Sequence, residues 1–209
     1  MSNVVITASN VSAVSFPLPI YEARMLGELE SNGETFSICV GLGKPLVEQL
    51  REKSLDTSDT DLQENTSDHQ RFGEGSYEEW YAKDRTPFAL VHKKTGALAA
   101  LVWFGPKPLG RKSLKYLSEE ELQKESQQKE EEWHTLVYRS YLPFRGKGLM
   151  KEFVQFTINA YKTRYPEAKL WVGGRADNMA SVKLAEKLGF KRRDDLFDAE
   201  KNWAAMTLE

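Results

Sequence analysis

Apolar residues recur along this chain at two spacings, one typical of strands and the other typical of helices. Runs rich in β-branched and aromatic residues predict strands, and apolar residues three or four positions apart predict helices. The expected strands cover residues 36–40, 88–93, 97–104, 133–142, 170–172, 190–192 and 203–208, and the expected helices cover residues 45–53, 76–84, 149–164 and 179–188. Their order predicts an α/β fold with a mixed, mostly antiparallel central sheet flanked by helices.

Short polar signals support several of these boundaries. A capping box over residues 76–79 (Ser-Tyr-Glu-Glu) fits the start of a helix, and Asp177 or Asn178 is available to cap a later one. Gly189 stands where a left-handed residue commonly ends a helix. Lys94-Thr95-Gly96 separates two strand-like runs and predicts a hairpin.

Two stretches, residues 54–75 and 106–132, are so polar that we expect both to be surface excursions. The second contains another capping box at residues 118–121, which predicts a solvated helix. Residues 1–19 lack the basic and long apolar regions of a secretory signal. We interpret them as part of the fold or as a docked arm.

The length of 209 residues predicts a single domain, residues 1–209. Lys and Arg (29) nearly balance Asp and Glu (31), so no global basic field exists to attract nucleic acid or a membrane surface. Cys39 is the only cysteine, which excludes an internal disulfide and any zinc spacing, and we expect no bound metal. A lone thiol fits a reducing compartment, and without a targeting segment we expect a cytoplasmic location, with the nucleus as the alternative.

The most informative local feature is the run from Arg145 to Gly148, which joins an expected strand directly to an expected helix. Glycines without Cβ atoms, the first N–H groups of a helix and its dipole together favour an anion at such a loop. Lys147 and Lys151 add charge, and pyrophosphate is the natural occupant. The alternative is a tight turn with solvated basic residues. The loop does not match the phosphate-binding patterns of kinases, GTPases or dinucleotide-binding dehydrogenases.

Two segments resemble motifs of the GNAT N-acetyltransferase superfamily. Residues 145–150 (Arg-Gly-Lys-Gly-Leu-Met) resemble its [RQ]-x-x-G-x-[GA] loop, which binds the pyrophosphate of acetyl-CoA. Residues 178–190 resemble its N-x-x-[AS]-x-x-L-x-E-K-L-G-F helix. The resemblance covers residues 88–208 and implies the GNAT-like acyl-CoA N-acyltransferase fold. Residues 1–87 align with nothing in that pattern, and residues 106–132 read as a charged insertion.

The resemblance implies acetyl-CoA as co-substrate and a set of residues to hold it. These are Ser140, Tyr141, Leu142, Arg145, Gly146, Lys147, Gly148, Leu149, Met150, Asn178 and Ser181. Two positions depart from the family pattern. Met150 stands where glycine or alanine is usual, and Ala185 stands where many members carry a tyrosine that protonates the departing thiolate.

Acetyl transfer to an amine requires the amine to be neutral, so we expect a general base. His134 lies about a dozen residues before the loop, where the family often carries its base, and Glu132 is the second candidate. An ordinary strand histidine is the alternative for His134. With Ala185 in place of tyrosine, the thiolate proton would come from Tyr138, Tyr141 or a water.

The leading hypothesis is an acetyl-CoA-dependent N-acetyltransferase that moves an acetyl group directly to a primary amine of a small molecule or a protein. A second hypothesis is a catalytically impaired regulatory module that binds acyl-CoA, which Ala185 and Met150 favour. A general nucleotide-binding domain is a third. A homodimer is left open by the sequence.

Overall fold

The computed structural model describes residues 4–9, 11–112 and 132–208, and its strands form one continuous sheet. Within the described residues the sheet has nine strands in the order β1-β2-β3-β4-β5-β6-β7-β9-β8, and every neighbouring pair is antiparallel except β6 and β7. The strands are β1 (Val4–Ala8), β2 (Arg24–Ser31), β3 (Glu34–Val40), β4 (Thr86–His92), β5 (Leu98–Pro106), β6 (Trp133–Ser140), β7 (Lys169–Arg175), β8 (Lys191–Asp198) and β9 (Trp203–Leu208).

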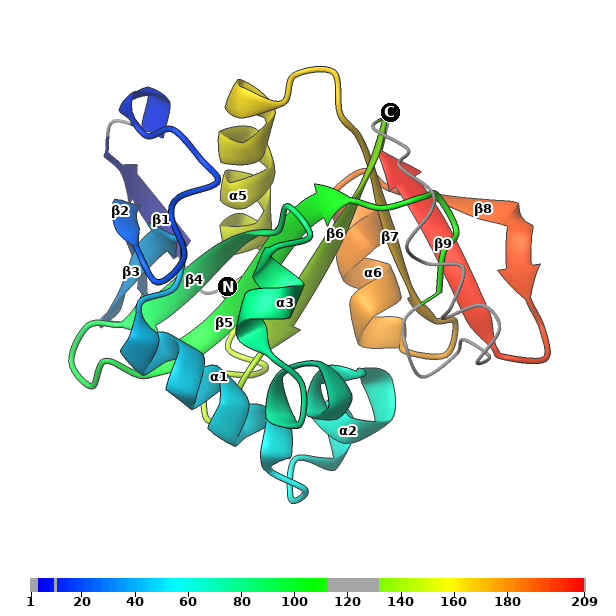
Figure 1. The fold of residues 1–209 in the computed structure, drawn as a ribbon, viewed down its shortest axis with the longest axis horizontal. Coiled ribbons are helices and arrows are strands. Elements are labelled where there is room, and N and C mark those ends of the chain that lie inside the picture. The colour runs from blue at the N-terminus through cyan, green and yellow to red at the C-terminus, as the bar shows by residue number, and fades with distance from the viewer. Residues whose placement is uncertain (1–3, 10, 113–131, 209) are drawn as a thin grey trace.

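Helices cover both faces of this sheet. They are α1 (Lys44–Leu55), α2 (Thr60–Asn65), α3 (Tyr77–Tyr81), α5 (Met150–Arg164) and α6 (Met179–Lys187), with a 3-10 turn at Val11–Ala13 and a π-helical turn at His69–Gly73. Figure 1 shows α1, α2 and α3 gathered on the near side of β4 and β5. None of the helices in the described part of the chain has the length and apolar character needed to cross a membrane.

Two buried clusters fill the space between the sheet and its helices. The larger joins residues of α5, such as Phe153 and Tyr161, to one face of the central strands. The smaller joins α1 and α3 to the opposite face, where Trp80 and Phe72 contact Trp103 of β5 edge to face. The strand alternation of β6 therefore sends Leu136 toward α5 and Val137 toward α1 and α3.

The α/β fold class expected from the sequence is confirmed, with a mixed, mostly antiparallel sheet and helices on its faces. The hairpin joins β4 to β5, Ser76 caps α3 by accepting the Glu79 N–H, and Asn178 caps α6. Gly189 follows α6 with φ +90°. Each of these features depends on residues close together in the chain, which is why the sequence alone predicts it.

Two expectations need correction. Residues 54–75 are not a surface excursion, because they form α2 and the π-helical turn and bury Leu62, Phe72 and Asp68. Their few apolar side chains are supplemented by buried ion pairs, which a composition argument does not detect. The strands β1 and β2 were not expected. The solvated helix expected at residues 118–121 lies outside the described residues.

The parallel strands β6 and β7 separate part-way along their length. They pair only at Trp133, His134 and Thr135 of β6, opposite Lys169, Leu170 and Trp171 of β7. β6 then continues to Ser140 and β7 to Arg175 without further pairing between them. β5 pairs with the opposite edge of β6. Beyond Thr135, the edge of β6 that faces β7 therefore keeps backbone groups that no neighbouring strand uses.

Candidate active site

A cavity of about 870 Å³ opens where β6 and β7 separate. It is bounded by β6, by the loop between β6 and α5, by the start of α6, and by α2 and α3 on the opposite side. The residues that line it include Asp61, Arg71, Glu79, Trp80, Trp103, Lys107, Thr135, Val137, Tyr138, Arg139, Ser140, residues 144–151, Trp171, Asn178, Ser181 and Trp203. A second hollow of about 50 Å³ lies between the separated strands, against Ala185 of α6.

The start of α5 forms one end of the cavity and carries no side-chain cap. Leu149 occupies its N-cap position, whereas α2, α3 and α6 are capped by Asp59, Ser76 and Asn178. The first N–H groups of a helix need partners from outside the helix, and its dipole favours an anion there. The open end of α5 is therefore suited to a negatively charged ligand.

Glycines shape the loop that leads into α5. Gly146 and Gly148 have φ values of +80° and +79°, which side chains with a Cβ rarely adopt. The N–H groups of Arg145 and Lys147 donate to the carbonyls of Tyr141 and Phe144 at 3.0 and 3.4 Å, so these two amides are already used within the chain. The amides of Gly146, Gly148 and Leu149 have no hydrogen bond within the described structure and remain for a ligand.

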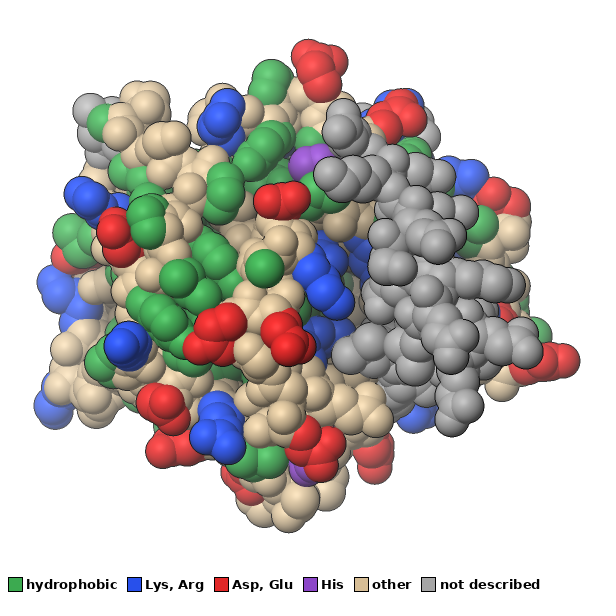
Figure 2. Space-filling model, viewed as in Figure 1, with side chains coloured by type: hydrophobic (Ala, Val, Ile, Leu, Met, Phe, Trp, Pro, Cys, Tyr) green, Lys and Arg blue, Asp and Glu red, His purple; other side chains and the backbone are tan. Residues whose placement is uncertain are grey.

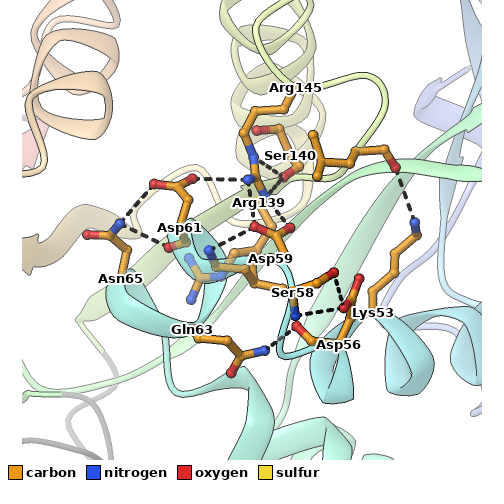
Figure 3. Close-up of polar contacts among 12 residues, drawn as sticks. Lys53, Asp56, Ser58, Asp59, Asp61, Gln63, Asn65, Arg139, Ser140 and Arg145 are labelled. Atoms are coloured by element: carbon orange, nitrogen blue, oxygen red, sulfur yellow. Dashed lines mark hydrogen bonds and ion pairs between the residues drawn. The ribbon is translucent and has the colours of Figure 1, made fainter.

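The side chain of Arg145 is held by α2. Its Nη1 and Nη2 atoms donate to the two oxygens of Asp59 at 2.7 and 2.6 Å, and Nη1 also lies 3.2 Å from Asp61 (Figure 3). Its Nε and Nη2 atoms donate to the Ser140 carbonyl at 3.1 and 3.0 Å. The hydrogen bond from Arg145 lowers the pKa of Asp59 below its usual value. Arg145 therefore ties α2 to the end of β6.

The other basic residues of the loop are also paired. Lys147 Nζ lies 3.2 Å from Glu34, and Lys151 Nζ lies 2.9 Å from Glu152. The charges that the sequence places beside the loop are thus largely compensated. The anion-binding character of this end depends on the backbone amides and the helix dipole more than on net charge.

The free edge of β6 forms the floor between the loop and the point where the strands join. Ser140 lines the cavity, but Tyr141 and Leu142 do not. The Tyr141 N–H donates to the Ala99 carbonyl at 2.9 Å, and Leu142 is 55% exposed at the surface. The free edge beside the cavity therefore runs from Leu136 to Ser140 and ends where the expected segment begins. Its Tyr138 and Ser140 carbonyls already accept hydrogen bonds from Arg139 and Arg145.

The start of α6 meets β6 at Tyr138. The Tyr138 hydroxyl donates to the Ser181 carbonyl at 2.9 Å and lies 3.0 Å from Ser181 Oγ. Burial raises the pKa of Tyr138, so its phenol stays protonated at neutral pH. Asn178 lines the same wall while its Oδ1 accepts the Ser181 N–H at 3.1 Å. The structure therefore brings Asn178, Ser181 and Tyr138 together on one wall.

The two candidate bases lie outside this cavity. His134 is buried on the face of β6 that meets α5, where its Nδ1 atom lies 2.6 Å from the Tyr161 hydroxyl. Glu132 is exposed and forms an ion pair with Lys169. The structure does not bring either residue to the cavity wall.

A model of the acetyltransferase (GNAT) family matches residues 47–190. The chain belongs to this family. Membership implies acyl-CoA N-acyltransferase activity, and the match extends the likeness to residue 47, upstream of residue 88, where the resemblance seen in the sequence begins. No curated protein matches the sequence significantly.

Solved structures of GNAT proteins share the fold at low sequence identity. The GNAT domain of S. lividans PAT is 13% identical with a TM-score of 0.55, and the match covers 85% of this chain and 92% of that domain. RimL, a ribosomal L7/L12 alpha-N-protein acetyltransferase in complex with coenzyme A, is 15% identical with a TM-score of 0.55, covering 82% and 93%. An acetyltransferase from Agrobacterium tumefaciens str. C58 is 12% identical with a TM-score of 0.56, covering 94% and 97%.

Several residues of this GNAT site escaped sequence reasoning. Asp59, Asp68 and Arg139 belong to stretches with no recognisable motif, and the ion pairs that join Asp59 to Arg145 and Asp68 to Arg139 span 71 or more positions of the chain. Trp103 packs with Trp80, yet both also line the cavity. The polar stretch 54–75 does contain one signal of ordered structure. Asp59 caps the start of a helix there, and the oppositely charged Asp68 and Arg71 follow three residues apart.

Proposed function

We propose that this GNAT protein transfers an acetyl group from acetyl-CoA directly to a primary amine. The observation that carries the proposal is the joining, in one cavity, of the uncapped α5 start and the free edge of β6. An uncapped helix start suits pyrophosphate, and a free strand edge suits an amide-bearing arm laid beside it. Coenzyme A contains both groups.

The residues present fit this co-substrate. Gly146 and Gly148 let a phosphate approach the backbone, and the amides of Gly146, Gly148 and Leu149 are the donors proposed for it. The edge from Leu136 to Ser140 would pair with the pantetheine arm, with Asn178 and Ser181 on the other side. Met150 keeps its main-chain amide at the start of α5, so the departure from glycine or alanine leaves the donor intact.

When bound, acetyl-CoA supplies the acetyl group as a thioester, whose C–S bond breaks with its electron pair on sulfur while the C–N bond to the amine forms. Tyr138 is the proposed proton donor to sulfur, because its neutral hydroxyl lies on the cavity wall. Its one proton is donated to the Ser181 carbonyl in this structure, and the hydroxyl would turn from that carbonyl to the thiolate when the C–S bond breaks. In this proposal Tyr138 does the work of the tyrosine that Ala185 replaces. Ala185 and Tyr138 line the same small hollow, so a phenol at either position would lie on the same side of the co-substrate.

The acceptor amine must lose a proton to attack. The described cavity wall contains two carboxylates, Asp61 and Glu79, and Asp61 is engaged by Arg145. Positive charge on the wall lowers the pKa of an amine that enters, because like charges disfavour the ammonium. We therefore propose that the amine releases its proton to water, with Glu79, the other carboxylate of the described wall, on a water-mediated path.

The alternative is an acyl-CoA-binding regulatory protein without turnover, favoured by the absence of His134 and Glu132 from the described wall. Calorimetry with acetyl-CoA and an assay of thiol release over a broad panel of amines separate the two. Micromolar binding with release of free thiol supports transfer. Binding without thiol release from any amine supports the regulatory alternative, and absence of binding contradicts both.

A further inference from the structure

Basic side chains outnumber acidic ones on the described wall of the cavity. Figure 2 shows Lys and Arg side chains in a recess on this face. The whole chain has a net charge of −2, yet Asp61 and Glu79 are the carboxylates of the described wall. The basic residues of the wall that belong neither to the loop before α5 nor to α6 include Arg71, Lys83, Arg85, Lys107, Arg111 and Arg139.

Two of these arginines share one buried carboxylate. Arg71 Nη1 lies 2.6 Å from Asp68 Oδ1, and Arg139 Nε lies 2.7 Å from Asp68 Oδ2. The Asp68 side chain is 1% exposed. Burial alone would raise the pKa of Asp68, but the two guanidiniums keep it below its usual value. Two cations and one anion give this group of three a net charge of +1.

Both guanidiniums lie over the ring of Trp103. The centre of the Arg71 guanidinium is 5.5 Å from the ring centroid, and that of Arg139 is 5.2 Å away. Arg139 uses three of its five N–H donors, on Asp68 and on the Tyr138 carbonyl. One N–H on each of its terminal nitrogens remains, which suits a bidentate carboxylate or phosphate.

This cationic pair is separate from the phosphate loop. Trp103 lies opposite Val137, three residues upstream of Ser140, which corresponds to roughly 10 Å along a strand. Trp103 also packs with Phe72 and Trp80 on the face opposite α5. The pair therefore lies beside the free edge of β6, on the side of the cavity that the arm of the co-substrate leaves for an acceptor.

We propose that the acceptor is a small amine that also carries an oxyanion group, a carboxylate or a phosphate, and that this group binds Arg139 and Arg71 over Trp103. The inference rests on the proposed acetyl transfer and names the class of its acceptor. A small molecule fits because the Arg71 and Arg139 side chains are only 15% and 16% exposed. The oxyanion would also hold its amine beside the thioester.

Matched acceptors test this inference. Each amino acid is compared with its amide, and phosphoethanolamine is compared with ethanolamine, by thiol release at saturating acetyl-CoA. We expect at least one acid to exceed its neutral partner about tenfold or more in kcat/KM. Preference for the amino acid identifies a carboxylate, and preference for phosphoethanolamine identifies a phosphate. Equal rates within every pair, or a preference for polyamines, overturn the inference while leaving acetyl transfer intact.

Arg139→Gln isolates the charge. The variant should lose the preference, so that the acid and its neutral partner react at equal rates, and Arg139→Lys should keep part of the preference. Lys94→Gln is the matched control, because Lys94 is an exposed lysine of the β4–β5 turn away from the cavity. Acetyl-CoA affinity checks that each variant folds. An unchanged preference in Arg139→Gln contradicts the assignment.

A binding measurement keeps the inference testable without turnover. The CoA-saturated protein is titrated with N-acetylphenylalanine and with its amide, and tryptophan fluorescence reports on Trp103 together with the other tryptophans. The difference between wild type and Arg139→Gln assigns the signal. Binding of the acid alone, lost in Arg139→Gln, supports the inference even if no transfer is found. Equal binding of the acid and the amide, or no binding of either in wild type, counts against it.

Discussion

Arg145 donates from both terminal nitrogens to the two oxygens of Asp59, at 2.7 and 2.6 Å. The contact joins the loop before α5 to the start of α2, 86 positions earlier in the chain. Asp59 also caps α2 by accepting the Leu62 N–H at 3.1 Å. One carboxylate therefore fixes both the start of a helix and the side chain that begins the loop.

Asp59→Asn should destabilise the protein at neutral pH but not in acid. Asparagine keeps the cap, so the change removes the ion pair alone, and we expect a loss of about 2 kcal/mol for this largely buried pair. The pKa of Asp59 is lowered in the folded state, mainly by its hydrogen bond from Arg145. The stabilisation is therefore complete above the unfolded pKa of about 3.9 and disappears as the pH falls through the lower folded value.

Urea unfolding at several pH values measures this difference. Asp195→Asn is the matched control, because Asp195 forms an exposed pair with Arg193 two residues away and should show no measurable effect. A difference between wild type and Asp59→Asn that stays constant from pH 7 to acid would contradict the role assigned to the ion pair.

Gly148→Val should weaken acetyl-CoA binding about tenfold or more. Gly148 has φ +79°, and a β-branched side chain there both strains the backbone and obstructs the approach of a phosphate. Gly96→Val is the control for strain alone, because Gly96 has φ +69° in the β4–β5 turn and open space around its Cβ position. Calorimetry that finds equal affinity in both variants would exclude the loop as the phosphate site.

Tyr138→Phe should lower kcat about 10²-fold while acetyl-CoA affinity stays near that of wild type. The proposed proton donor is lost, but the ring and its packing remain. Since burial raises the pKa of Tyr138, the wild-type rate should not fall with rising pH up to about pH 10, the usual pKa of tyrosine.

Tyr165→Phe serves as the control for Tyr138, because the Tyr165 hydroxyl lies outside the cavity. Single-turnover assays quenched at successive times separate the rate of acetyl transfer from the rate of product release. A Tyr138→Phe variant with wild-type kcat would show that water supplies the proton.

Local sequence signals predict the C-terminal half of the fold. They do not predict the side of the cavity proposed for the acceptor. Gly146, Gly148 and Asn178 are informative because loop conformation and capping depend on neighbours in the chain. Asp68 and Arg139 meet across 71 positions, and no periodicity encodes a contact of that kind. The face of β6 that carries His134 follows from alternation, but which face meets the cavity depends on where α1 and α3 pack.

His134→Gln should reduce stability and leave turnover close to wild type. His134 is 6% exposed and lies 2.6 Å through Nδ1 from the Tyr161 hydroxyl, so its loss removes a buried hydrogen bond at a cost of about 1 to 2 kcal/mol. Tyr161→Phe should cost a similar amount, and the double variant should cost less than the sum, because both changes remove the same contact. Denaturation of the four proteins measures the coupling. Loss of thiol release in His134→Gln, with native stability and acetyl-CoA affinity, would instead establish His134 as the base.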